Sequence, residues 1–377
     1  MKRNVFIYIT ILIILTIIIL YSTRLIGDPC NFSKSIYYLR VLLIIITFPV
    51  LLKIVHLIIK SGLKDRYKRY LLTVSSIVML FLLFEAIFMF VSRSFGTSYP
   101  LADQNWVRKY WKPINSFGYR DAEVDVKLAK SKNNILVIGS SYVAGDGIRN
   151  TEDRFSGRLQ KKISDNYQVY NLGYCGSDAL DEYNRLLEFP VKPDILILSH
   201  TTKSINGAVE RSKLQTPEYY KVDEGLNAVS AFLIQNSYLL NYVFWKYYGT
   251  KKLFPQYIED IEHNAVFFYL QEEILSRHLL NLDRFIQYCN QKAIPLIVVS
   301  FPALNNGIAF TKMIVNNPIE NFFNERGVIY ISVYDLVKDL PESKRTINSN
   351  DSHPSVLVNK IIAEELYKTL VENNIVK

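Results

Sequence analysis

The sequence predicts an α/β protein with three membrane-spanning helices at its N-terminus, followed by a domain with a parallel sheet and a helical insertion. Two patterns predict this fold class. Long apolar runs dominate residues 1–93, and from residue 134 onward short apolar runs alternate with segments of helical composition, as in β-α-β units. The composition agrees, because 49% of the 377 residues are hydrophobic, more than one soluble core requires.

The N-terminal region contains three apolar runs, Asn4–Tyr21, Ile36–Ile59 and Tyr70–Val91. Each run, as a helix, is long enough to cross a hydrocarbon core of about 30 Å. The basic start of the chain is typical of a signal peptide, but no small-residue cleavage site follows and further apolar runs do. We therefore expect residues 1–93 to form an uncleaved three-span anchor.

Basic residues between the runs predict how this anchor is oriented. The link before the third run is strongly basic, with Lys60, Lys64, Arg66, Lys68 and Arg69. The link before the second run is poorer, with Arg24, Lys34 and the acidic Asp28. By the positive-inside rule, the N-terminus is cytoplasmic and everything after Arg93 is extracytoplasmic. The sequence thus predicts a multi-pass protein of the inner membrane.

The net charge of +9 follows from this topology, since much of it flanks the apolar runs. No nucleic-acid-binding signature accompanies it, so we expect no nucleic acid partner. One acidic residue, Glu85, lies inside the third run. An intramembrane carboxylate is a candidate functional group. The alternative, which we favour, is structural: a protonated Glu85 bonded to a neighbouring helix, or an ion pair with Arg40.

Residues 94–133 connect the anchor to the α/β domain. The segment is polar with scattered aromatic side chains, which suit a membrane interface. Within it, Asn115–Asp121 is interpreted as a turn and a short lead-in strand, and Lys127–Asn133 as a charged linker.

Residues 134–377 carry the alternating pattern. Short apolar runs predict five strands: Ile135–Ile138, Tyr167–Leu172, Asp194–Leu198, Leu296–Val299 and Val328–Ile331. Three segments have helical composition: Asp153–Ser164, Asp178–Phe189 and Ser355–Asn373. Such alternation implies a parallel sheet with right-handed crossovers. No clear strand occurs at about 207–292, so we expect a helical insertion there, either as extra packing or as a lid or substrate platform.

A serine follows the first predicted strand at the place where open α/β sheets bind their ligands. The run Ile135–Ile138 ends at Gly139, and two hydroxyl residues, Ser140 and Ser141, come next. Ligands of such sheets bind beyond the carboxyl ends of the strands. We interpret Ser141 as a candidate nucleophile, which then requires a base, an orienting acid and oxyanion donors.

The remaining chemistry lies directly before the last helix, in the sequence Asp351-Ser-His-Pro. Histidine is the usual general base near neutral pH. Of the five histidines, His353 is the one with an acid two residues before it and a proline after it. We therefore select His353 as base and Asp351 as its orienting acid.

In these segments the chain resembles the SGNH, or GDSL-type, hydrolases. The first block of that family, at the end of the first strand, resembles Gly139-Ser140-Ser141; the second resembles Asn171-Leu172-Gly173; the last resembles Asp351-Ser352-His353-Pro354. The resemblance runs from about Asn115 to the C-terminus, without the insertion. It implies a flavodoxin-like domain in which Ser141 attacks an ester carbonyl, His353 takes its proton, and Asp351 holds the imidazole. The amides of Ser141 and Gly173 would donate to the oxyanion.

The chain departs from the family pattern at two places. Ser140 stands where the family has Asp before the nucleophile. In the third block the family has an asparagine oxyanion donor, and a gap-free alignment puts Lys203 there. The nearest asparagine is Asn206; His200 and Thr202 are other candidate donors near the same strand end.

The function expected from these residues is a membrane-anchored serine esterase. Its substrates would be O-acyl (acetyl) groups of cell-surface polysaccharide, or lipid esters. Two alternatives stay open: an O-acyltransferase acting on extracytoplasmic glycan with the same serine, and a non-catalytic binding or assembly protein of the same fold. We expect no metal and no cofactor. Among the three cysteines, Cys175 and Cys289 either form one bridge or stay separate buried thiols, as we favour; Cys30 lies near the anchor.

Overall fold

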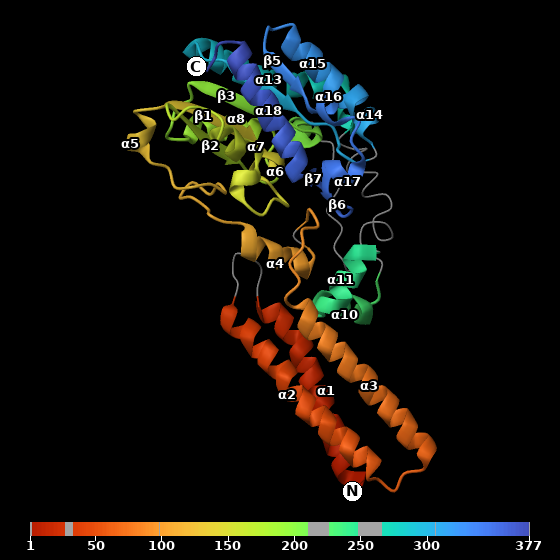
Figure 1. Cartoon of the computed structure of the whole chain (residues 1–377). Coiled ribbons are helices and arrows are strands. Elements are labelled where there is room, and N and C mark those ends of the chain that lie inside the picture. Colours follow the sequence, from red (N-terminus) through yellow and green to blue (C-terminus); the bar gives the residue numbers. More distant parts are fainter. Residues whose placement is uncertain are drawn as a thin grey trace. The chain divides into compact units, whose positions relative to one another are not determined.

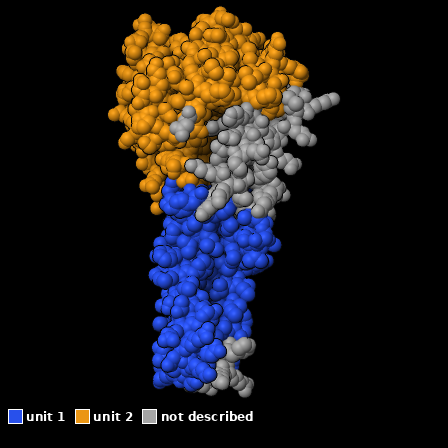
Figure 2. Space-filling model, turned by 90° about the vertical axis from the view of Figure 1, so that its right-hand side faces the viewer, with its two compact units in different colours: residues 1–93, 98–108, 220–253 blue, residues 94–97, 109–219, 254–377 orange. Residues whose placement is uncertain are grey.

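The computed structural model describes residues 2–26, 33–97, 99–209, 226–247, 266–305 and 307–376. The chain forms two compact units, coloured separately in Figure 2. Unit 1 comprises residues 1–93, 98–108 and 220–253, and unit 2 comprises residues 94–97, 109–219 and 254–377. Both units therefore combine segments that are far apart in the sequence.

Unit 1 is helical (Figure 1). Its long helices are α1 (Lys2–Ile26), α2 (Lys34–Ile59) and α3 (Asp65–Phe88). Among the described residues, α2 and α3 are long and apolar enough to cross a membrane, whereas the apolar stretch Ile7–Thr23 of α1 is shorter. Only 28% and 17% of the apolar windows of α2 and α3 are buried, so most of these apolar residues keep surface that the described chain does not cover.

The described residues of unit 1 also form three shorter helices: α4 (Leu101–Tyr110, whose last residues belong to unit 2), α10 (Ala228–Asn236) and α11 (Tyr238–Tyr247). The last two come from the middle of the predicted insertion. They pack on α1 and α3 rather than on the sheet. The insertion expected at 207–292 is therefore divided between the two units.

Unit 2 contains a five-stranded sheet in the order β2-β1-β3-β4-β5. Its strands are β1 (Asn133–Gly139), β2 (Tyr167–Gly173), β3 (Ile195–His200), β4 (Leu296–Ser300) and β5 (Ile329–Ser332). Every neighbouring pair is parallel. This confirms the predicted parallel sheet, and its order is that of flavodoxin-like folds, with a switch point beside β1.

The sheet is covered on both faces, as a parallel sheet must be. Alternate residues of β1 point to opposite sides: Leu136 and Ile138 join one core cluster, and Ile135 and Val137 join the other. The first cluster contains side chains of α8 (Ala179–Glu188), α13 (Glu272–Lys292) and α15 (Asn317–Asn324). The second contains side chains of α7 (Phe155–Gln160), α16 (Val333–Val337) and α18 (Val356–Glu372) (Figure 1).

Helix α13 is thus the regular crossover between β3 and β4, although its residues fall inside the predicted insertion. Its buried side chains Ile274, Leu282 and Phe285 belong to the core of the sheet. An amphipathic crossover helix and a helical insertion have the same periodicity in the sequence, so periodicity alone did not separate them.

The other predicted helices begin where their capping residues stand. Asp178 accepts from the amides of Leu180 and Asp181 at the start of α8, and the Ser355 hydroxyl accepts from the amide of Val358 at the start of α18. The helix predicted at Asp153–Ser164 is shorter: α7 ends at Gln160 and follows the 3-10 turn η1 (Thr151–Asp153).

The remaining elements of unit 2 are short. They are α5 (Val126–Ala129), α6 (Ser141–Ala144), η2 (Thr202–Ile205), α9 (Asn206–Val209), α14 (Ile308–Thr311), the π-helical turn η4 (Lys312–Asn316), α17 (Glu342–Arg345), and the antiparallel pair β6 (Thr346–Asn348) and β7 (Asp351–Pro354).

The lead-in strand predicted within Asn115–Asp121 is wrong, because the segment is a turn. The Asn115 side chain accepts from the amides of Phe117 and Tyr119, at 3.1 and 3.0 Å. Asparagine side chains compete with strand pairing in this way. The charged linker after it contains α5 and the first residue of β1.

Two alternatives were open for Cys175 and Cys289, a disulfide bridge or separate thiols, and the structure shows separate thiols. Cys175 is exposed and Cys289 is buried, and neither forms a disulfide. Burial raises the pKa of the Cys289 thiol to about 12. Cys30 lies outside the described residues.

Candidate active site

Ser141 lies at the carboxyl end of β1, as the first residue of α6. Strand and helix meet closely here, because a Cβ on Gly139 would lie 2.6 Å from Val143 Cγ2 and 2.7 Å from Ser199 Cβ. The short helix ends at Gly145, whose φ of 77° is left-handed, a conformation that glycine adopts without strain. Two glycines thus allow the sharp turn that presents Ser141 at the sheet edge.

His353 and Asp351 lie on the β7 strand of the small antiparallel pair. His353 Nε2 is 2.9 Å from Ser141 Oγ, and His353 Nδ1 is 2.7 Å from Asp351 Oδ1. The carboxylate of Asp351 has no exposed surface and also accepts from the His353 amide at 3.0 Å. Because an ionised carboxylate only accepts hydrogen bonds, it requires the proton on Nδ1 and leaves the Nε2 lone pair facing Ser141.

A second segment of unit 2 supports the acid. The hydroxyl of Ser94 donates to Asp351 Oδ2, and the carbonyl of Ser94 accepts from Asn348 Nδ2 at 3.0 Å. Two residues later, Gly96 has a φ of +66°, and a Cβ there would lie 3.0 Å from Asp351 Oδ1. We call residues 94–97 the strap. It was not predicted, because 257 positions separate Ser94 from Asp351 and no motif marks it.

A second carboxylate, Asp146, lies on the other side of the imidazole. Its Oδ2 is 3.9 Å from His353 Nε2, and 22% of its side chain is exposed. Burial alone would lower the pKa of His353, but the carboxylates of Asp351 and Asp146 outweigh it and raise that pKa to about 9. Burial raises the pKa of Asp146 itself.

The pKa of Asp351 is shifted in the opposite direction, downward. Burial would raise the pKa of this carboxyl, but the charge of His353 and the hydrogen bonds from His353 and Ser94 lower it. Asp351 is therefore the ionised acid of the site.

Two of the residues predicted beyond β3, Lys203 and Asn206, lie on the short helices η2 and α9 that follow the strand. Lys203 is an exposed residue of η2, and its charge lowers the pKa of His353. Asn206 is half-buried at the start of α9. Its neighbour Gly207 packs against Asp178, since an added Cβ would lie 2.4 Å from Asp178 Oδ1.

His200 bonds to other buried side chains and not to Ser141. It lies in a buried cluster, with Nε2 3.1 Å from His278 Nε2 and 3.1 Å from the Tyr269 hydroxyl, and Nδ1 3.3 Å from Ser300 Oγ. Burial lowers the pKa of His200 to about 3, so the ring is neutral. Thr202 begins η2 and is half-buried.

The amide of Gly173 already has an acceptor, the side chain of Asn171, at 3.0 Å. Its missing side chain serves packing, because a Cβ at this position would lie 2.1 Å from the backbone nitrogen of Ala144. The following turn contains a second glycine, Gly176, with a φ of +81°. Its amide makes no hydrogen bond to any residue that the structure describes. Gly176 was not among the predicted donors.

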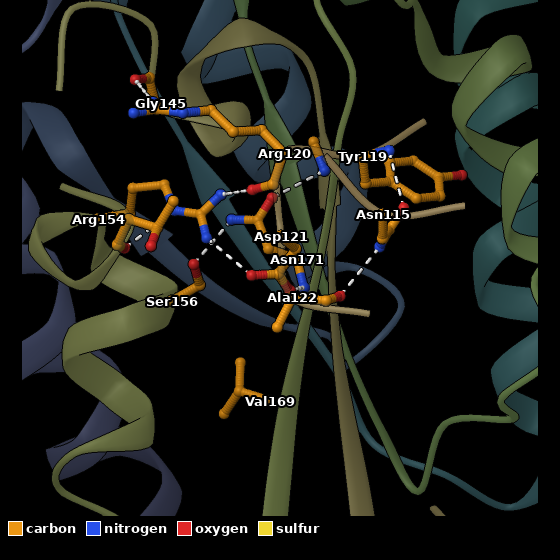
Figure 3. A network of polar contacts seen from close by, with 12 residues as sticks. Asn115, Tyr119, Arg120, Asp121, Ala122, Gly145, Arg154, Ser156, Val169 and Asn171 are labelled. Atoms are coloured by element: carbon orange, nitrogen blue, oxygen red, sulfur yellow. Dashed lines mark hydrogen bonds and ion pairs between the residues drawn. The ribbon is translucent and has the colours of Figure 1, made fainter. Parts of the chain in front are cut away.

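A buried polar network holds the elements behind Ser141 in place (Figure 3). Arg154 Nη2 is 2.9 Å from Asp121 Oδ1, and Asp121 Oδ2 accepts from the amide of Asn171 at 2.9 Å. Asn171 Nδ2 donates in turn to Ser156 Oγ at 2.7 Å. The network therefore joins the turn before β1 to α7 and to β2.

Arg120 extends this network to the loop that follows α6. Its guanidinium donates to the carbonyls of Gly145 and Ile148, at 2.6 and 2.7 Å, while its own carbonyl accepts from Arg154. Burial lowers the pKa of Arg120 to about 10, which leaves it charged at neutral pH. The segment expected to be a lead-in strand thus fixes the loop that carries Asp146.

Comparisons with known proteins add the following. No family model and no curated protein matches the chain. Among solved structures, the chain is similar to TesA at 14% identity, over 63% of this chain and 98% of that one, with a TM-score of 0.39. It is similar to a carbohydrate acetylesterase family member from Sinorhizobium meliloti at 12% identity, over 64% and 98%, with a TM-score of 0.37. A putative lipolytic protein of the G-D-S-L family from Desulfitobacterium hafniense is similar at 15% identity, over 63% and 100%, with a TM-score of 0.36.

Proposed function

We propose that the protein is a serine esterase whose nucleophile is Ser141. The observation that carries the proposal is the geometry of three side chains. Ser141 Oγ lies 2.9 Å from His353 Nε2, and Asp351 holds Nδ1 at 2.7 Å. Nucleophile, base and orienting acid at these distances are the constellation that performs acyl transfer on unrelated folds.

The reaction follows from this arrangement. Ser141 Oγ attacks the ester carbonyl while His353 Nε2 takes the hydroxyl proton, and Asp351 stabilises the imidazolium that forms. The tetrahedral intermediate collapses as His353 gives the proton to the leaving alcohol. Water then attacks the acyl-enzyme, His353 takes its proton, and the carboxylic acid leaves as Ser141 regains its hydrogen.

The negative charge of the tetrahedral oxygen requires donors, and we assign it the amides of Ser141 and Gly176. Neither makes a hydrogen bond to a described residue, whereas the amide of Gly173 is engaged by Asn171. Asn206 is proposed as the third donor, and the ammonium group of Lys203 adds positive charge nearby. Removing one such donor typically costs about 100- to 1,000-fold in rate.

The base can act only when it is neutral. With a pKa of about 9, His353 is mostly protonated at pH 7, so activity should rise with pH as this group loses its proton. The enzyme would work best in mildly alkaline conditions, or with a substrate that lowers the pKa of His353 by shielding it from Asp146.

We further propose that α1, α2 and α3 span the inner membrane, with the N-terminus in the cytoplasm and unit 2 outside. The apolar surfaces of α2 and α3 support this, as do the basic residues between them. An active site in that location meets acylated glycans and lipid esters. We propose O-acetyl groups of cell-surface polysaccharide, or lipid esters, as the substrates.

A fluorophosphonate probe tests the catalytic serine directly. The wild-type protein in detergent should be labelled, and Ser141→Ala should abolish the labelling. Ser140→Ala is the matched control, since Ser140 is adjacent and its side chain does not cap α6. Labelling that is absent in the wild type, or kept in Ser141→Ala, would refute the nucleophile and favour a non-catalytic binding protein.

Release of free acetate from an O-acetylated polysaccharide tests the reaction. Acetate formed without an added acceptor supports hydrolysis. If acetyl groups leave the donor only when a second glycan is present and then appear on that glycan, the protein is an acyltransferase.

A further inference from the structure

Unit 1 contains a buried ion pair that the proposed chemistry does not use. Arg40 on α2 and Glu85 on α3 are joined at 2.5 Å between Nη2 and Oε1, and neither side chain has any exposed surface. This is the structural pairing that the sequence favoured for Glu85.

The carboxylate of Glu85 does more than neutralise Arg40. Its oxygens accept from the hydroxyl of Ser237 at 2.7 Å, and from the amides of Tyr238 and Leu239 at 2.8 and 3.1 Å. These amides lie at the start of α11, where the first N–H groups of a helix have no acceptor within it. Glu85 therefore caps the N-terminus of α11 from a helix 152 positions away in the sequence.

Arg40 binds the C-terminal end of the preceding helix, α10. Its Nη2 donates to the carbonyl of Asn236 at 3.2 Å, the last residue of α10. The same carbonyl accepts from the Thr23 hydroxyl of α1 at 2.7 Å. The break between α10 and α11 thus has polar groups of α1, α2 and α3 on both sides. In Figure 1 the two helices lie beside the end of α3 that carries Glu85.

Such a break is tolerated in a lipid environment only if its backbone groups are satisfied, and charges are tolerated there when they are paired. The outer surface of the two helices is apolar, with Val229 69% exposed and Tyr247 60% exposed. Trp245 stacks on Tyr99 with ring centroids 6.0 Å apart, and tryptophan and tyrosine concentrate at the membrane–water interface.

We propose that α10 and α11 form a lipid-facing hairpin, whose exposed side chains contact phospholipid at the outer face of the bilayer. Its apolar surface belongs to the same unit as the exposed side chains of α2 and α3, such as Leu52 and Ile77, so one lipid phase covers both. The inference rests on the proposed membrane location of α1–α3, but it does not depend on the esterase activity. It assigns the middle of the predicted insertion to the membrane rather than to a lid over the sheet.

Single cysteines carrying an environment-sensitive fluorophore test the hairpin. The full-length protein, with Cys30, Cys175 and Cys289 replaced by alanine, is reconstituted in phosphatidylcholine vesicles. Three positions are compared: Ile77→Cys on α3, Val229→Cys on α10 and Val356→Cys on α18, which are 60%, 69% and 42% exposed. Each label is challenged with a lipid-borne nitroxide and with aqueous iodide.

We expect a blue-shifted emission and stronger quenching by the nitroxide than by iodide at positions 77 and 229, and the reverse at position 356. If the labels at positions 77 and 229 are both quenched mainly by the lipid-borne nitroxide, both the anchor and the hairpin are supported. If position 77 contacts lipid and position 229 responds mainly to iodide, the hairpin inference is overturned while the anchor stands. If position 77 itself responds mainly to iodide, anchor and hairpin both fail.

Two variants test whether the ion pair holds the hairpin. Glu85→Ala should abolish the lipid quenching at position 229 and leave it unchanged at position 77, which reports that α3 is still inserted. The exchange Arg40→Glu with Glu85→Arg restores a charge pair, but arginine cannot accept from the amides of α11. The exchange should therefore not restore quenching at 229; full restoration would show that pairing alone, rather than capping, is what matters.

Discussion

Two carboxylates with no exposed side-chain surface, Glu85 in unit 1 and Asp351 in unit 2, are held in similar ways and do different things. Each accepts at least three hydrogen bonds and each faces one basic partner. Glu85 receives a guanidinium, a hydroxyl and two amides. Asp351 receives an imidazole, a hydroxyl and one amide.

The difference lies in the partner. The guanidinium of Arg40 only donates hydrogen bonds and bonds to helix groups of unit 1, so its pairing with Glu85 fixes structure. The imidazole of His353 can gain and lose a proton and presents its second nitrogen to Ser141, so in the proposed mechanism its pairing with Asp351 tunes the base. A full set of hydrogen bonds on a buried carboxylate therefore does not distinguish a structural role from a catalytic one. The chemistry of its basic partner does.

The largest expected effect comes from breaking the catalytic pair. Asp351→Asn keeps the volume of the side chain but favours the wrong tautomer of His353, so kcat should fall by about 10⁴-fold. Hydrolysis of 4-nitrophenyl acetate by the purified protein in detergent measures this. Glu85→Gln is the control, since loss of the Glu85 charge should leave the activity of the folded protein unchanged. An Asp351→Asn variant with near-normal kcat would contradict the assigned triad.

Breaking the structural pair should cost stability instead. Glu85→Ala leaves Arg40 buried without its counter-charge and α11 without its cap, so the free energy of unfolding should drop by about 3–5 kcal/mol. Thermal unfolding in detergent measures the change. Replacing both residues, with Arg40→Met and Glu85→Leu, should recover part of the loss, because no unpaired charge remains. A single variant as stable as wild type would refute the structural role.

A smaller effect should follow from removing the strap's hydrogen bond. Ser94→Ala deletes the hydroxyl that donates to Asp351. Hydrogen bonds to charged groups contribute about 1.5–3 kcal/mol. If about half of this energy stabilises the transition state, kcat/KM should fall about tenfold. Ser94→Thr should retain most of the activity. Ser92→Ala is the control, because the Ser92 hydroxyl is buried without a hydrogen-bond partner in the described structure.

The smallest effect is a shift along the pH axis. His353 has a pKa raised to about 9, so kcat/KM should increase as the pH rises through that value and decrease below it, where the base is protonated. Asp146→Asn removes one of the two carboxylates that raise this pKa. The rising limb should then move to lower pH by about one unit, equivalent to about 1.4 kcal/mol. A limb that stays in place would show that Asp146 does not act on His353.

The parts that the sequence predicted are those with a local signal. Apolar runs such as Ile135–Ile138 marked the strands, because a strand buried on both faces must be apolar throughout. Ser141, Asp351 and His353 were selected because each follows or precedes an element whose end is visible in the sequence. Their meeting was expected from the family resemblance rather than from the parallel topology, because Asp351 and His353 lie on β7, which pairs with β6 outside the parallel sheet.

The parts that were missed depend on distant partners or on side-chain direction. Ser94 has no feature that distinguishes it from other serines until Asp351 is placed beside it. Gly173 was chosen as an oxyanion donor by its position after a strand, but its amide donates to Asn171, which only coordinates reveal. Helices α10 and α11 were predicted only as part of an insertion. Their periodicity shows that one face is apolar, but it does not show which part of the molecule covers that face.

The strap has a consequence for how this protein can be divided. Residues 94–97 belong to the catalytic unit although the rest of that unit begins at residue 109. A shortened chain starting at residue 109 would contain Ser141, Asp351 and His353, yet Asp351 would lose one of its three donors. A separated catalytic domain therefore has to begin no later than residue 94 if Asp351 is to keep all three of its donors. Fusion or shuffling of this catalytic module would succeed only where the first residues after the membrane travel with it.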